Sequence, residues 1–187
     1  PLLVLARLRR GAELLSAGVQ GNRMARAGVE TAWWDLIAAR RGVTLATLVS
    51  ERLAELGVPA QWRAARSHID CGVALGMPPE MNVSVLRTWV AQALGRGYKR
   101  IKLKVRPGWD VEPIRIAREE MQRARREVPM WVDANGSYDA TRDRDALRKL
   151  DSMQLLFLEQ PLPADGLWAS RELGRELKTP ICLDESL

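Results

Sequence analysis

The sequence has few of the residues that build disulfide frameworks, zinc sites or histidine-based catalytic sites. Its 187 residues include two cysteines and one histidine. Cys71 and Cys182 are far apart, each within a predicted strand, which indicates buried thiols in a reducing cytoplasm in preference to a disulfide. The single histidine, His68, leaves little room for histidine-based catalysis, and at the start of a strand it is more typical of a hydrogen-bonded structural residue.

Long apolar runs are also absent. No stretch reaches the roughly 18 residues that a membrane-spanning helix needs, and residues 1–10 are too short and too basic for a secretory signal. We therefore expect a cytoplasmic protein with no membrane partner. The chain begins at Pro1 without an initiator methionine and ends at Leu187, directly after the last predicted strand. We expect it to be an internal piece of a longer protein.

Positive charge is concentrated in the first third of the chain. Residues 1–66 hold ten arginines and five acidic residues, whereas residues 67–187 hold nineteen basic and eighteen acidic residues. A nucleic-acid surface would be a basic stripe interleaved with aromatic residues or glycines, but these arginines are scattered over helical segments. We interpret them as a solvated helix face, and expect no specific nucleic-acid partner and only weak, salt-dependent binding of DNA.

The first third of the chain is helical in its pattern. Residues 22–41 predict a helix that ends at Gly42 as its C-cap, and a second helix is predicted from residue 44 or 45 to Leu56. The apolar face expected of the first helix consists of Met24, Ala27, Val29, Ala32, Trp34, Leu36 and Ile37. Residues 61–67 are expected to be a connection.

From about residue 67 the pattern changes to short apolar runs that alternate with helical segments. Predicted strands begin near residues 69, 100, 130, 155 and 181, and predicted helices cover about 80–96, 110–128, 139–150 and 166–177. Strict alternation implies a parallel sheet. The Gly-x-Gly-x-x-Gly of a dinucleotide-binding unit is missing. Charged residues at several consecutive strand ends favour an α/β fold of the TIM (β/α)8-barrel type, of which this chain has about five strands.

Three carboxylates end or follow consecutive predicted strands. Asp133, Glu159 and Asp184 are separated by 26 and 25 residues, one strand–helix–strand step each time. A charge at the end of a buried strand is costly unless it meets a metal, a counter-charge or solvent. Carboxylate ligands without His or Cys favour Mg²⁺ over zinc, with Mn²⁺ as a substitute. The regular spacing predicts that these carboxylates form one site.

Two lysines accompany them. Lys102 and Lys104 project to the same side of their strand, and their proximity, partial burial and a nearby metal would lower the pKa of one of them. Such a lysine can act as a general base. A lysine beside a magnesium site suits removal of the proton alpha to a carboxylate, because the metal stabilises the enediolate that forms.

These residues stand in motifs that resemble those of the enolase superfamily, muconate-lactonizing subgroup. The motifs are Lys-x-Lys at 102–104, Asp-Ala-Asn at 133–135, Glu-Gln-Pro at 159–161 and Asp-Glu-Ser at 184–186. Segments 71–73, 97–110 and 180–186 are similar to the branch of o-succinylbenzoate synthases and N-acylamino acid racemases. The resemblance runs from about Gly21 onward. It implies that residues 1–66 are the helical end of a capping domain and that 67–187 begin the barrel.

The resemblance also implies roles for single residues. Asp133, Glu159 and Asp184 would be the Mg²⁺ ligands, Lys104 the acid/base lysine and Lys102 its electrostatic neighbour. Asn135 and Glu185 lie beside ligands, and Trp109 and Gly108 are expected to shape the substrate side. The family's second lysine would lie beyond Leu187, and its specificity loop before Pro1. Apart from the resemblance, Trp33, Trp34, Trp131 and Trp168 are expected to serve in packing.

The implied reaction is dehydration to o-succinylbenzoate in menaquinone synthesis, racemisation of N-acylamino acids, or both. The substrate would be a small carboxylate, and the full-length protein a homo-oligomer. Dipeptide epimerisation and muconate cycloisomerisation are alternatives, against which segment 107–110 argues mildly, and a non-catalytic remnant is a third. We expect the 187 residues alone to lack activity and, with an unpaired strand edge, to aggregate or need a partner.

Overall fold

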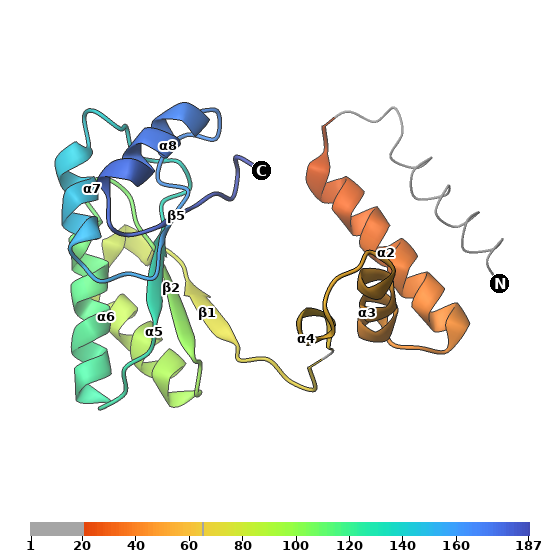
Figure 1. Cartoon of the computed structure of the whole chain (residues 1–187). Coiled ribbons are helices and arrows are strands. Elements are labelled where there is room, and N and C mark those ends of the chain that lie inside the picture. The colour runs from red at the N-terminus through yellow and green to blue at the C-terminus, as the bar shows by residue number, and fades with distance from the viewer. Residues whose placement is uncertain (1–20, 65) are drawn as a thin grey trace. The chain divides into compact units, whose positions relative to one another are not determined.

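The chain divides into two compact units, residues 1–69 and 70–187. The structure, a computed structural model, describes residues 21–64 and 66–187 (Figure 1). The expectation that residues 1–10 are no secretory signal lies outside the described residues. Assignment of the first unit to a capping domain stays a prediction. Among the helices of the described residues, none combines the length and the apolar composition that a membrane crossing requires.

The described residues of the first unit form three helices: α2 (Arg23–Arg41), α3 (Leu45–Glu55) and α4 (Ala60–Arg63). Gly42 ends α2 in the left-handed conformation, with φ of 66°, which glycine adopts without steric cost. The Thr44 side chain accepts a hydrogen bond from the backbone N–H of Thr47 and caps α3. Both predicted helices are confirmed, whereas the short α4 lies where a connection was expected.

The apolar face that the sequence predicts for α2 is buried over only part of its length. Ile37 is buried in a small cluster with Ala38 and Leu48, and Trp33 and Trp34 pack against it. Met24, by contrast, is 90% exposed, and Val29 and Leu36 are about half exposed. Within the described residues, this cluster includes only the C-terminal half of α2, so the rest of the expected face is not covered.

The second unit is a sheet of five parallel strands joined by helices. The strands are β1 (Gly72–Leu75), β2 (Arg100–Lys104), β3 (Met130–Asp133), β4 (Leu158–Glu159) and β5 (Ile181–Cys182), and the helices are α5 (Val83–Gly95), α6 (Val111–Arg123), α7 (Arg144–Asp151) and α8 (Leu167–Glu176), with a 3-10 turn at Pro79–Met81. The strands lie side by side in chain order, all parallel. A doubly wound sheet reverses its strand order, and a barrel does not. The predicted partial barrel is confirmed.

Several boundaries differ from the prediction. β1 and β4 are shorter than their apolar runs, and α5 begins only at Val83, where the Asn82 side chain accepts a hydrogen bond from the N–H of Val85. Both cysteines are free, but Cys71 is exposed and Cys182 half-buried. The prediction of two buried thiols is therefore wrong. β1 begins after Cys71 and has only β2 as a neighbour among the described strands, so nothing in this part of the chain covers that thiol.

Alternation along the strands separates the core from the functional side chains. In β2, Ile101 and Leu103 are buried in the core, while Lys102 and Lys104 face the other way. Figure 1 shows α6 and α7 along one side of the sheet, the side on which this core lies. The opposite side is thus left to the charged residues.

Candidate metal centre

Three carboxylates converge at the carboxyl ends of neighbouring strands. Asp133 and Glu159 are the last residues of β3 and β4 and stand opposite one another in the parallel register, and Asp184 follows β5. One carboxylate oxygen from each lies within 4.8 Å of the others. Asp133 is buried and Asp184 is exposed, so the group opens toward solvent on one side. This set of hard oxygen donors fits a cation such as Mg²⁺ or Mn²⁺.

Both lysines of β2 reach into this group. Lys102 Nζ lies 2.8 Å from Asp133 Oδ2 and 2.8 Å from Glu159 Oε1. Lys104 Nζ lies 2.6 Å from Asp133 Oδ2 and also donates to Asn135 Oδ1. The sequence correctly places the two lysines on one side of the strand. Two ammonium groups against three carboxylates leave one net negative charge.

The contacts set the direction of two pKa shifts. Burial lowers the pKa of Lys102, but hydrogen bonds to Asp133 and Glu159 outweigh it and hold that pKa above its ordinary value. Burial raises the pKa of Asp133, but hydrogen bonds from Lys102, Lys104 and the Asn135 N–H outweigh it and hold that pKa below its ordinary value. Lys102 does not show the lowered pKa expected for one lysine of the pair, because its ammonium meets carboxylates, and the expectation stays a prediction.

Asn135 and Glu185 lie beside the carboxylates, as expected. The Asn135 backbone N–H donates to Asp133 Oδ1 over 3.0 Å, and its Nδ2 donates to Glu185 Oε1 over 2.8 Å. Asn135 itself has a positive φ of 44°, a conformation that asparagine tolerates better than most residues. The amide therefore connects the loop after β3 to the loop after β5.

Gln160 has a role that the sequence analysis missed. Its side chain is fully buried. Oε1 accepts hydrogen bonds from the backbone N–H groups of Asp184 (2.8 Å) and Ser186 (3.2 Å), and Nε2 donates to Leu162 O and Ser186 Oγ, both over 2.8 Å. One amide thus holds the loop that carries Asp184 against the end of β4. The only indication in the sequence was its place between Glu159 and Pro161.

The tryptophans differ from their expected roles. Trp131 packs against Phe157, with ring centroids 5.3 Å apart and the rings tilted by 37°, but its Nε1 also donates to Glu159 Oε2 over 2.8 Å. Trp168 is 71% exposed, with the Arg171 guanidinium over its ring, so its predicted packing is wrong because it lies on the outer face of α8. Trp109 is only 5% exposed and belongs to the core, which corrects its expected place at the substrate side.

Residues 85–187 match the family of enolase C-terminal domain-like proteins. The chain belongs to this family, and the resemblance to the enolase superfamily is confirmed. The chain is 40% identical over 191 residues to an o-succinylbenzoate synthase of Geobacillus kaustophilus. The alignment covers 100% of this chain and 45% of that protein. The chain is also 39% identical over 171 residues to an N-succinylamino acid racemase of Thermus thermophilus, covering 91% of this chain and 41% of that one.

Solved structures agree with this assignment. A probable mandelate racemase from Alicyclobacillus acidocaldarius superposes with a TM-score of 0.75 at 37% identity, over 96% of this chain and 42% of that one. The chain thus spans less than half the length of these relatives.

Proposed function

We propose that this chain is part of a Mg²⁺-dependent enzyme that removes the proton alpha to a substrate carboxylate. Asp133, Glu159 and Asp184 would hold the metal. The convergence of these carboxylates from three consecutive strand ends to within 4.8 Å carries the proposal. The similarity to synthases and racemases of the enolase superfamily supports it. When bound, the metal would supply the positive charge that stabilises an enediolate.

The two lysines are suited to different tasks. The Lys102 side chain is 19% exposed and bonds two of the carboxylates, whereas the Lys104 side chain is 30% exposed and bonds only Asp133 among them. Lys104 can therefore turn toward a substrate at lower cost, and we assign it the acid/base role. Lys102 would stay bonded to Asp133 and Glu159. Its positive charge would offset the electrostatic repulsion between these two carboxylates.

The substrate would be a small-molecule carboxylate. Formation of o-succinylbenzoate by dehydration, a step of menaquinone synthesis, is favoured by the 40% identity to a synthase, and racemisation of N-acylamino acids by the 39% identity to a racemase. Both begin with the same proton removal, so one half-site serves either. The second lysine and the specificity loop would lie outside this chain, and the complete enzyme would be a homo-oligomer.

The test is exchange of the alpha proton of an N-acylamino acid in D2O by the full-length protein, with and without Mg²⁺, together with dehydration of the o-succinylbenzoate precursor. Exchange should require metal and fall by roughly 10²–10⁴-fold in Lys104→Ala. Lys149→Ala, at an exposed position on α7, is the matched control and should leave exchange unchanged. A folded, metal-bound protein that neither exchanges nor dehydrates any of these substrates would favour the non-catalytic remnant.

A further inference from the structure

Trp131 lies among the charged residues of the metal centre, although it is neither a ligand nor a charge. It stands between Met130 and Val132, which are buried in the core, so alternation along β3 turns its side chain to the face that carries the carboxylates. In the parallel register it pairs with Lys102. A Cβ added at Gly72 would lie 3.5 Å from Trp131 Cη2, so the indole reaches as far as β1.

The indole N–H is hydrogen-bonded to one of the carboxylates. Trp131 Nε1 donates to Glu159 Oε2 over 2.8 Å, and Lys102 Nζ donates to Oε1 over 2.8 Å. Each oxygen of Glu159 therefore has one donor. A carboxylate offers about four lone-pair sites, so both oxygens keep acceptor capacity for a cation. The Phe157 ring packs against the indole at an interplanar angle of 37° and limits where the N–H can point.

The two donors differ in charge. Lys102 neutralises part of the negative charge that a metal needs, whereas an indole N–H is a neutral donor and leaves that charge in place. Neutral hydrogen bonds to a ligating carboxylate orient it, and their loss typically lowers metal affinity by about 10- to 100-fold.

We infer that Trp131 is a positioning residue of the metal centre, which orients the Glu159 carboxylate for the metal through its indole N–H. The inference rests on the proposed function, because the orientation of Glu159 matters in this way only if Glu159 binds a metal. It concerns the ligand and not the reacting atoms, so binding of the metal alone tests it.

The experiment measures Mn²⁺ binding by the full-length protein, from the electron paramagnetic resonance of the free ion. Trp131→Phe keeps an aromatic ring but loses the donor, and affinity should fall about tenfold. Trp131→Gln loses the ring but keeps an N–H donor, and should bind more tightly than the Phe variant. Trp168→Phe, at the exposed tryptophan of α8, is the matched control and should bind as the unmutated protein does.

The outcomes separate this inference from the proposed function. If the unmutated protein binds no Mn²⁺, both fail. If it binds Mn²⁺ and Trp131→Phe binds equally well, or better than Trp131→Gln, the inference alone fails and the indole only packs.

A measurement on the unmutated protein covers the case in which the variants do not fold. The indole N–H resonance of Trp131, identified by its contacts with Phe157, should shift as Mg²⁺ is added. A resonance that does not move at saturating Mg²⁺ overturns the inference.

Discussion

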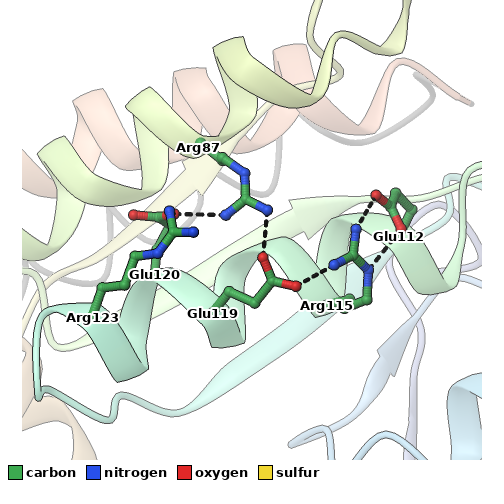
Figure 2. Close-up of polar contacts among 6 residues, drawn as sticks. All are labelled: Arg87, Glu112, Arg115, Glu119, Glu120 and Arg123. Carbon is green, nitrogen blue, oxygen red and sulfur yellow. Dashed lines mark hydrogen bonds and ion pairs between the residues drawn. The ribbon is translucent and has the colours of Figure 1, made fainter.

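Two clusters of charged side chains in the second unit use the same kinds of residue and differ in their balance of charge. The inner cluster, at the strand ends, consists of Lys102, Lys104, Asp133, Glu159 and Asp184. The outer cluster, on α5 and α6, consists of Arg87, Glu112, Arg115, Glu119, Glu120 and Arg123 (Figure 2). The outer cluster pairs three arginines with three glutamates, whereas the inner one sets two lysines against three carboxylates.

The outer cluster is an ion-pair network that joins two helices. Figure 2 shows Arg87 reaching from α5 to Glu119 and Glu120 on α6, and the contact with Glu120 is 2.8 Å long. Arg115 bonds Glu112 and Glu119 one turn away on its own helix. Hydrogen bonding to Arg87 holds the pKa of Glu119 below its ordinary value. Because each carboxylate already has an arginine, the cluster has no excess negative charge for a metal.

The comparison shows why carboxylate number alone does not indicate a metal site. Strand ends of a parallel sheet bring side chains from distant parts of the chain to one edge, so carboxylates can gather there in excess of cations. On helix surfaces, residues three and four apart pair locally and balance one another. The inner cluster therefore has an excess of negative charge for a metal, whereas in the outer cluster each carboxylate is balanced by an arginine.

The largest expected effect is loss of metal binding in Asp133→Asn. Asp133 is buried and is a candidate ligand that also accepts from both lysines, so affinity for Mn²⁺ should fall by more than the roughly 10- to 100-fold typical of residues that only support a ligand. Isothermal titration of the full-length protein measures it, after circular dichroism has shown that the variant is folded.

Glu119→Gln in the outer cluster is the matched control and should not change Mn²⁺ affinity. Unchanged Mn²⁺ affinity in Asp133→Asn, or a loss of affinity in Glu119→Gln, would contradict the distinction between the two clusters.

A second, smaller effect is expected of Gln160→Leu. The change removes the acceptor of the Asp184 and Ser186 N–H groups, and a buried polar group left without a partner costs about 1–3 kcal/mol. Denaturant unfolding should show this loss, and Mn²⁺ affinity should fall about tenfold because the loop of Asp184 is less fixed. Gln92→Leu, at an exposed position on α5, is the control. Equal stability of the two variants would contradict the role of Gln160.

The strand ends of the inner cluster were predictable because each short apolar run is bounded by turn-forming residues and a charge follows it directly. The spacing of Asp133, Glu159 and Asp184 then corresponds to one β-α unit each, and the structure places their oxygens together. Their roles as ligands stay a prediction.

The supporting contacts of Trp131 and Gln160 were not predictable. Both depend on strand register and side-chain direction, which a sequence of short apolar runs leaves open. The outer faces of the helices were also misjudged, at Trp168 and at Met24, because apolar composition does not say whether another element covers a face.

Asp133 is expected to take up its proton at a lower pH than the exposed carboxyl groups do. Its pKa lies below the ordinary value because hydrogen bonds from Lys102, Lys104 and the Asn135 N–H outweigh burial. A group whose folded-state pKa is lowered contributes stability that is present above its unfolded pKa and is lost as the pH falls through the folded pKa. In metal-free buffer this loss should therefore occur below about pH 4. Carbon-13 resonances of the carboxyl groups should show Asp133 still ionised when exposed carboxyl groups have taken up protons. Titration with the exposed groups would contradict the contacts.

The smallest effect, and the one most sensitive to salt, is expected of Arg87→Met in the outer cluster. The variant loses the contacts between α5 and α6, in which Arg87 and Glu119 are 26% and 31% exposed and Glu120 is 10% exposed. Unfolding in metal-free, low-salt buffer should show a small loss of stability, because partly solvated ion pairs contribute little. Lys102→Met removes the corresponding contacts of the inner cluster, where the Asp133 partner is almost fully buried. Salt screens partly solvated pairs more than buried ones, so 1 M NaCl should weaken the Arg87→Met effect more than the Lys102→Met effect. Arg148→Met, at an exposed position on α7, controls for the change of net charge. Equal sensitivity of the two effects to salt would mean that the inner cluster is as solvated as the outer one, and would contradict the burial of its ion pairs.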